Sequence, residues 1–422
     1  MDPGRWILPS LLEPMGLVST WLWWPMKRML IDGYVGFTFA FGSFQTYYEL
    51  DYLAADSPSN ISWIGTVSTF LLIVGGVISG PLFDLGYFRT MLFVGAATQT
   101  FGVFMLSLCT KYYQIFLAQG IVIGLGTGLL YLPGLALVGR SFKKHRAMAM
   151  GITTCGAPTG GIIFTLIFEQ LIARYEFGWT VRVMGFLMVG TYIVSFPLLL
   201  WGVHNLGDIA SGTPRKLIDM TAFRDLPFWS YSFSNFFIFC GYMVPFVYIA
   251  SYGQIQIGMS RSWALYTIMI AQASSVLGRL VAGYTAARVG VMIPWTICSF
   301  TSGILCIAWI GAKTSGSFIA YAALYGCFSG ALIPLPPSIF PVVCPDPKVL
   351  GARLGMAQAI GSVASLIGSP IAGALSEIGA TEDRPNYIGL QLFSGLIMVT
   401  GSMSLCGLWT LLIRRREVGK LI

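Results

Sequence analysis

The sequence Ser141-Phe-Lys-Lys-His-Arg-Ala-Met-Ala-Met-Gly-Ile-Thr-Thr-Cys-Gly156 sets four basic residues between two long apolar runs. These runs, 112–138 and 148–172, contain a single charged residue, Glu169. Each is long enough to cross a bilayer, for which about 20 apolar residues suffice. Because Lys and Arg in short loops remain on the cytoplasmic side, the stretch predicts two transmembrane helices joined by a cytoplasmic turn.

The composition extends this prediction to the whole chain. Of the 422 residues, 55% are hydrophobic and only 10% are charged, whereas a soluble domain has about 25% charged residues. So large an apolar excess predicts a polytopic membrane protein with the lipid bilayer as its partner. The net charge of +8 is explained by basic loops, so we expect no nucleic-acid partner. With two His residues and no C-x-x-C pair among eight Cys residues, we expect no metal site. No cofactor is expected either, because the sequence shows no nucleotide-binding domain.

Twelve spans are predicted by length and hydropathy. They cover residues 29–49, 61–83, 90–110, 112–138, 148–172, 181–203, 227–251, 263–286, 291–311, 315–343, 354–376 and 389–413. An even number of spans places both ends of the chain on one side, and most of the 25 Lys and Arg residues lie in the ends and loops of that side. The positive-inside rule therefore predicts that both termini are cytoplasmic, with the plasma membrane as the expected location.

A long hydrophilic interval, 204–226, follows the sixth span and is typical of a linker. We therefore predict a cytoplasmic N-terminal segment 1–28, a six-helix bundle 29–203, the cytoplasmic linker 204–226, a second six-helix bundle 227–413 and a cytoplasmic tail 414–422. The halves resemble each other weakly, since 80–86 follows the second span as 283–290 follows the eighth. The predicted fold is an all-α membrane protein with twelve transmembrane helices in two six-helix halves, the major facilitator design, with the substrate between the halves near the midplane.

Several motifs resemble one known family. They are Asn60-Ile-Ser-Trp-Ile-Gly65, Gly80-Pro-Leu-Phe-Asp-Leu-Gly86, the opening stretch, Gly278-Arg279, Tyr325-Gly326, Pro345-Asp-Pro347 and Arg353-Leu-Gly355. In these motifs the chain resembles the fungal branch of the monocarboxylate porter family. The resemblance implies a secondary active or facilitative transporter, not an enzyme, that moves a small organic acid by alternating access. The alternative is efflux of a secondary metabolite, and a membrane nutrient sensor is a third, weaker hypothesis.

Departures from the family pattern bear on energy coupling. The lysine of the family's first helix falls at Phe39, and the acid one turn before the family arginine is Ser275. Losing both charges predicts weak or no coupling to protons. If a proton is a partner after all, Asp32 or Glu169 would have to carry it.

Arg279 is the foremost candidate for substrate binding, because it lies in an otherwise uncharged segment. An Arg at the centre of a membrane helix costs about 2.5–3.5 kcal/mol on insertion scales and is normally functional, and its planar fork of donors suits a carboxylate. The alternative is that its side chain extends to the cytoplasmic interface. Further candidates for substrate contact are polar or aromatic residues within spans: Gln119, Tyr131, Asn235, Tyr242, Gln272 and Tyr325.

Charged residues at the predicted cytoplasmic ends form a second group, expected to brace loops or to gate. They are Asp84, Arg89, Lys143, Lys144, Arg146 and Arg353. Asn60 begins an N-x-S sequon on the predicted outer side and is a glycosylation candidate. The glycines of 120–128 recur at G-x-x-x-G spacing, which predicts close helix packing. A phosphate-binding loop is not expected there, because no Gly-Lys-Ser/Thr follows.

Overall fold

The computed structural model describes residues 35–131, 146–204, 218–380 and 385–414, and every structural statement below concerns these residues. Helices of the first half are α2 (Val35–Phe39), α3 (Phe41–Tyr47), η2 (Tyr48–Tyr52), α4 (Pro58–Asp84), α5 (Phe88–Leu106), α6 (Tyr112–Ile115), η3 (Phe116–Val122), α8 (Arg146–Thr154), α9 (Gly156–Ile172) and α10 (Phe177–His204). Those of the second half are η4 (Met220–Arg224), α11 (Leu226–Ile255), α12 (Arg261–Val289), α13 (Met292–Ala308), η5 (Trp309–Gly311), α14 (Ser315–Gly330), α15 (Leu335–Val343), α16 (Pro347–Glu377) and α17 (Tyr387–Arg414).

Ten helical segments in the described part of the chain are long and apolar enough to cross a membrane, and each matches one predicted span. The predicted third span corresponds to α5, which has 19 residues but is not among the ten. The predicted first span, 29–49, begins outside the described residues and continues as α2 and α3. The number of twelve spans is therefore supported at ten positions and stays a prediction at two.

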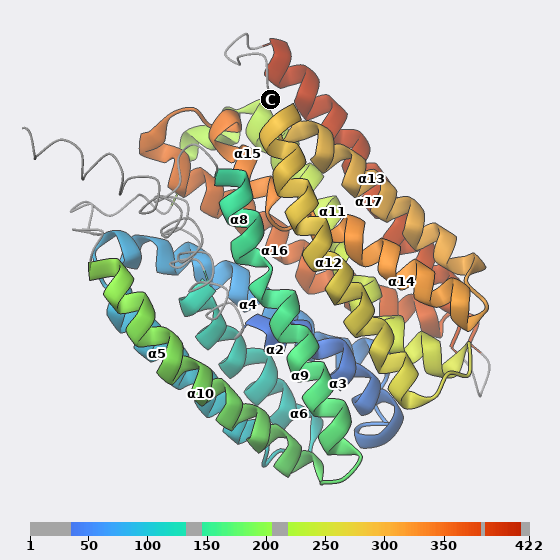
Figure 1. Ribbon diagram of the computed structural model, residues 1–422. Helices are drawn as coiled ribbons and strands as arrows, with labels where there is room; N and C mark the ends of the chain where they lie inside the picture. The colour runs from blue at the N-terminus through green and yellow to red at the C-terminus, as the bar shows by residue number, and fades with distance from the viewer. Residues whose placement is uncertain (1–34, 132–145, 205–217, 381–384, 415–422) are drawn as a thin grey trace, which may run out of the picture.

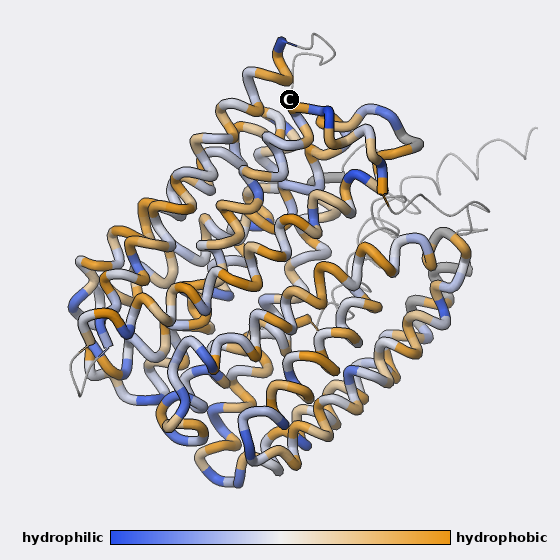
Figure 2. Tube along the Cα trace, turned by 180° about the vertical axis from the view of Figure 1, so that it is seen from behind, coloured by the Kyte–Doolittle hydropathy of each residue, from blue (hydrophilic) through white to orange (hydrophobic). Residues whose placement is uncertain are grey.

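Two groups of helices face each other in Figure 1, the first half in blue to green and the second half in yellow to red. Between them α4 packs against α16, α8 and α9 pack against α12, and α3 packs against α11. Hydrophobic residues follow the lengths of the helices, and hydrophilic ones are most frequent near the ends of the bundle (Figure 2). We call the end that carries loops 53–57, 173–176 and 256–260 the predicted outer end, and the opposite end the predicted cytoplasmic end.

Close approaches between backbones hold this arrangement together. A Cβ added to Gly36 would lie 2.3 Å from the backbone of Gly160, and one added to Gly128 would lie 2.5 Å from a backbone oxygen in α4. No side chain fits at such distances, so the helices meet through their backbones. The packing role predicted for the glycines of 120–128 is confirmed by these contacts.

The helical stretch from Val35 to Tyr52 is interrupted at Ala40. The α2 segment ends at Phe39, Ala40 forms a turn with ψ near −1°, and α3 begins at Phe41. Gly42 follows the break, and a Cβ there would lie 2.2 Å from the Phe246 carbonyl oxygen of α11. The break therefore lies where the two halves touch, as discontinuous helices do at the binding sites of many transporters.

Candidate functional site

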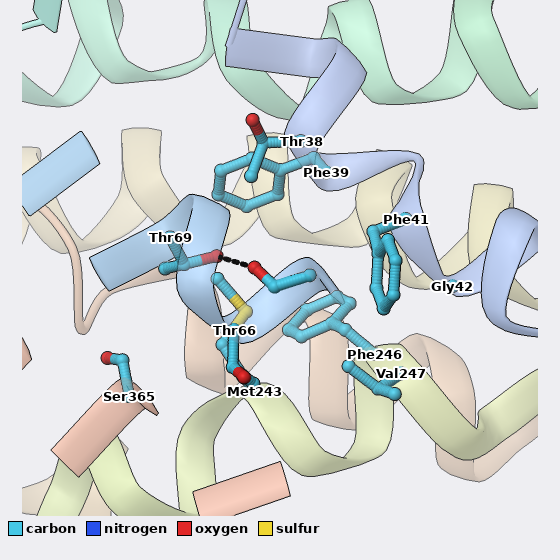
Figure 3. Close-up of a pocket in the computed structure, with 11 residues that line it drawn as sticks. Thr38, Phe39, Phe41, Gly42, Thr66, Thr69, Met243, Phe246, Val247 and Ser365 are labelled. Atoms are coloured by element: carbon cyan, nitrogen blue, oxygen red, sulfur yellow. Dashed lines mark hydrogen bonds between the residues drawn. The ribbon is translucent and has the colours of Figure 1, made fainter. Parts of the chain in front are cut away.

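A pocket lies between the halves beside the break in the first helix (Figure 3). The first half supplies Thr38, Phe39, Phe41, Gly42, Gly65, Thr66 and Thr69, and the second half supplies Met243, Phe246, Val247 and Ser365. The lining thus combines aromatic and aliphatic surface with a few hydroxyl groups, as small-molecule sites commonly do. Its cavity volume is about 20 Å³, little more than one water molecule needs. A metabolite can therefore enter only after side chains or the halves themselves move.

Arg279 lies next to this pocket, on the face of α12 that meets the first half. Its side chain is fully buried, so it does not extend to the cytoplasmic interface. Its Nη1 donates a hydrogen bond to the carbonyl oxygen of Thr154 at the C-terminus of α8, where the helix dipole favours a cation. Its Cζ atom lies 5.7 Å from the ring centroid of Phe39. The guanidinium therefore contacts the first half at two points.

Two nitrogens of this guanidinium remain available. Nε and Nη2 of Arg279 are buried and have no hydrogen-bond partner in the described structure. A buried charge normally pairs with an opposite charge or with several hydrogen bonds. Among the described residues no carboxylate pairs with Arg279. The site can therefore accept an anionic oxygen pair on that edge of the guanidinium.

Of the predicted polar contacts, Tyr242 lies near Arg279, and Gln272 lies near Phe39, which Arg279 contacts. The Tyr242 hydroxyl of α11 lies close enough to the guanidinium to interact with it, although the two do not meet hydrogen-bond geometry in the described structure. Gln272, two turns before Arg279 on α12, donates from Nε2 to the Phe39 carbonyl oxygen at 2.9 Å, and its own Oε1 is buried without a partner. Tyr242 therefore lies beside the guanidinium, whereas Gln272 holds the backbone of Phe39, whose ring the guanidinium contacts.

The remaining predicted contacts lie elsewhere. Gln119 accepts a hydrogen bond from the Tyr48 hydroxyl at 2.8 Å within the first half, and Tyr325 donates to the Tyr242 carbonyl oxygen at 2.7 Å within the second. Both bridge helices of a single half. Asn235 is buried with neither amide atom paired and lies against Gly361 of α16. Tyr131 is half-buried at the end of the described stretch.

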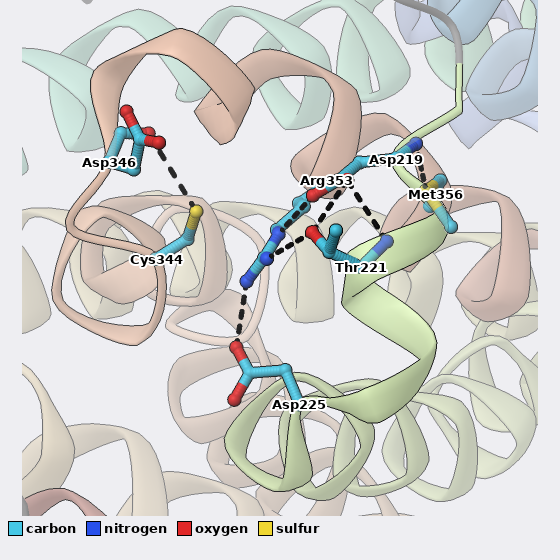
Figure 4. Close-up of polar contacts among 7 residues, drawn as sticks. All are labelled: Asp219, Thr221, Asp225, Cys344, Asp346, Arg353 and Met356. Atoms are coloured by element: carbon cyan, nitrogen blue, oxygen red, sulfur yellow. Dashed lines mark hydrogen bonds and ion pairs between the residues drawn. The ribbon is translucent and has the colours of Figure 1, made fainter.

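Arg353 joins the predicted linker to α16 (Figure 4). It donates to Asp219 and to Asp225 at 2.7 Å each, and to the Thr221 hydroxyl at 2.9 Å. Hydrogen bonds from the Thr221 hydroxyl and from Arg353 hold the pKa of the Asp219 carboxyl below its ordinary value. Thr221 lies in η4, Asp219 and Asp225 flank η4, and Arg353 lies in α16, so this cluster braces the second half internally.

The structure describes the other candidates only in part. Arg89 is exposed at the start of α5, and Asn60 is exposed near the start of α4. Asp84 is the last residue of α4 and Arg146 the first of α8, but their side chains lie outside the described structure, as do Lys143 and Lys144.

A set of contacts that the sequence did not reveal joins the halves at the predicted outer end. Glu49 of η2 accepts a hydrogen bond from Ser251 of α11 at 2.5 Å, and Asp51 pairs with Arg261 at 3.0 Å. Glu169 of α9 accepts a hydrogen bond from Ser262 of α12 at 2.6 Å. Each contact joins a carboxylate of the first half to a donor of the second. We call these three contacts the outer clasp.

With this geometry established, comparison with known proteins gives the class. The chain belongs to the major facilitator superfamily, whose family model matches residues 33–315. A solved structure of a bacterial homologue of the human drug peptide transporters PepT1 and PepT2 superposes with a TM-score of 0.67 at 15% identity, over 94% of this chain and 100% of that one. The protein is therefore a membrane transporter of the major facilitator fold.

Nearer relatives are fungal transporters. The chain is 38% identical to the aspyridones efflux protein apdF of Emericella nidulans, over 87% of this chain and 73% of that protein. It is 36% identical to the agnestins efflux protein AgnL12 of Paecilomyces divaricatus, over 87% and 82%. An MFS-type transporter of Aspergillus niger is 34% identical over 87% and 83%. These relatives favour the efflux alternative over carriage of a small monocarboxylate.

Proposed function

We propose that the protein exports a secondary metabolite, an amphiphilic molecule with an acidic group, through alternating access of its two halves. The observation that carries the proposal is the pocket between the halves, with the unpaired edge of Arg279 beside it. The guanidinium supplies a site for an acidic group, and the aromatic lining supplies a surface for an apolar body. The efflux proteins among the relatives support export as the direction.

In this proposal the transporter has two states, one in which the outer clasp is formed and one in which it is broken. While the three contacts hold, the predicted outer end is closed and the pocket can exchange only toward the opposite end. The exposed pair Arg261–Asp51, with side chains 42% and 49% exposed, contributes about 1 kcal/mol or less. The two hydrogen bonds from serines to Glu49 and Glu169 contribute about 1.5–3 kcal/mol each. A substrate carboxylate that accepts two hydrogen bonds from Arg279 gains a similar free energy. Substrate binding therefore supplies enough free energy to shift the equilibrium toward opening.

Metabolite profiling tests the proposal directly. Culture medium and cell extract would be compared by mass spectrometry in a host strain, its deletion strain and the deletion strain complemented with the wild-type gene. We expect at least one acidic, apolar metabolite to fall in the medium and to accumulate in the deletion cells, with reversal on complementation. An unchanged medium together with slower uptake of an external acid would contradict export.

Carriage of a small monocarboxylate is the second candidate, and the resemblance of the motifs to the monocarboxylate porters is what favours it. It predicts that lactate or acetate exchanges at rates that depend on Arg279. It gives no role to the aromatic lining of Phe39, Phe41 and Phe246, because a small acid leaves that surface uncovered. Rapid lactate exchange by the purified protein in liposomes would establish this candidate.

A further inference from the structure

We propose that Phe39 is a specificity-determining residue, whose ring makes the site selective for acids with a planar aromatic body over saturated acids of the same charge and size. This inference rests on the proposed function, because it concerns the chemical class of molecule that the same site receives. It assigns to Phe39 a role beyond filling the position where the monocarboxylate porters that the sequence resembles have a lysine.

The ring of Phe39 contacts both the pocket and the cation. Phe39 lines the pocket, and the Arg279 Cζ atom lies over its ring at 5.7 Å from the centroid. Arg279 itself is fully buried and is not among the residues that line the pocket. A molecule in the pocket therefore meets the aromatic ring before it meets the guanidinium.

The backbone of Phe39 is fixed more firmly than its ring. Its carbonyl oxygen accepts from Gln272 at 2.9 Å, and the adjacent Ala40 amide donates to the Gly36 carbonyl oxygen at 2.8 Å. The side chain is half-buried and faces a cavity. A small rotation of the ring can therefore admit a ligand group to the guanidinium while the helix break keeps its place.

The free edge of the guanidinium suits a planar oxyanion. Nε and Nη2 of Arg279 project their N–H bonds side by side, so both can donate to the two oxygens of one carboxylate. A cation against one face of an aromatic ring attracts the ring's electrons. An aromatic substrate would stack on the pocket face of the Phe39 ring. Its carboxylate would extend past that ring to Nε and Nη2 of Arg279.

The surroundings of Phe39 favour the same class of substrate. Phe41 and Phe246 contribute further aromatic surface, and Met243 contributes a thioether, which packs well against ring edges. Aromatic pairs prefer offset or edge-to-face contacts, which a pocket with aromatic walls from both halves can supply. A saturated ring of equal size would fill the same volume without these contacts.

Binding of two matched acids to the purified full-length protein tests the inference. The probes are 2-naphthoate and decahydro-2-naphthoate, which share charge and carbon skeleton, and the dissociation constants come from ligand-dependent shifts of the thermal unfolding midpoint in detergent. We expect the wild-type protein to bind 2-naphthoate about fivefold or more tightly than the saturated acid, as a ring-stacking preference predicts. Phe39→Leu should reduce this ratio to about one, by weakening only 2-naphthoate.

Matched variants keep the test decisive. Phe39→Tyr retains the ring and should retain the preference, and Arg279→Gln should weaken both acids together. The inference would be overturned if Phe39→Leu left the ratio of the two dissociation constants unchanged, or if it strengthened the binding of both acids equally. In either case the ring would only restrict access to Arg279 and would not select the substrate. Absence of binding by either acid to the wild-type protein would overturn it as well. None of these outcomes decides export, which metabolite profiling tests independently.

Discussion

Replacing Arg279 tests the proposed anion site most sharply. In Arg279→Gln the two free donors of the guanidinium edge and the positive charge are lost together. Hydrogen bonds to charged groups contribute about 1.5–3 kcal/mol each, so losing two should cost at least about 3 kcal/mol. Since about 1.4 kcal/mol corresponds to a factor of ten, binding of an acidic substrate should weaken by roughly 100-fold or more.

Arg279→Lys separates charge from geometry. A lysine keeps the charge but cannot donate two parallel hydrogen bonds to one carboxylate, so we expect about tenfold weaker binding. Neither variant should unfold the protein, because in the described structure Arg279 makes one hydrogen bond, to the Thr154 carbonyl oxygen, beside its contacts with Tyr242 and Phe39. Ser275→Asp, one turn earlier and also buried, should pair with Arg279 and compete with the substrate.

The assay is the initial rate of export from cells, divided by the amount of protein at the membrane. Arg288→Gln is the matched control, since Arg288 lies on the same helix but is exposed, with its guanidinium stacked on Tyr284 at 4.4 Å. It should export at the wild-type rate. Full export by Arg279→Gln at normal expression would refute the anion site.

Three further predictions concern stability, topology and coupling. Arg353→Ala leaves Asp219 and Asp225 without their half-buried cation, so the free energy of unfolding should fall by about 2 kcal/mol or more, measured by thermal unfolding with Arg353→Lys as an intermediate case. A cysteine at Asn60 should react with an impermeant thiol reagent in intact cells and one at Ser211 should not, and the reverse result would invert the predicted topology. Because no carboxylate lines the pocket of the described structure, export should depend only weakly on the proton gradient. Loss of export on adding a protonophore at fixed membrane potential would contradict this prediction of weak coupling.

The sequence predicted the helices well because hydrophobic length and the positions of Lys and Arg are local signals. It predicted the packing of the glycines for the same reason, since their spacing is visible along the chain. The break in the first helix was not predictable in this way. Gly42, which follows the break, lies against the Phe246 carbonyl oxygen about 200 residues further along the chain, and such a long-range contact leaves no local signal in the sequence.

The candidate site was predicted only in part, because sequence gives residue types but not their partners. Arg279 stood out as an isolated charge, yet its contact with Phe39 joins two distant helices. Gln119 looked like a substrate contact, but it pairs with Tyr48 within one half. Glu49 was missed, because a single acid at the end of an apolar run resembles an ordinary helix end. Only its contact with Ser251 reveals that it joins the halves.

Locking the predicted outer end tests alternating access itself. The Thr46 and Ser251 hydroxyl oxygens lie 3.2 Å apart across the interface of the halves, so cysteines at both positions lie close enough for a disulfide after a small adjustment. A protease site introduced into the predicted linker would reveal the cross-link, because the cleaved halves would then stay together without reductant. The two single variants are the controls for loss of each hydroxyl.

The decisive measurement is export by the Thr46→Cys/Ser251→Cys variant before oxidation, after oxidation and after reduction. If the halves must separate at this end in each cycle, export should fall in proportion to the cross-linked fraction and return to its starting rate when the disulfide is reduced. Export that continues at the full rate in fully cross-linked protein would contradict the account.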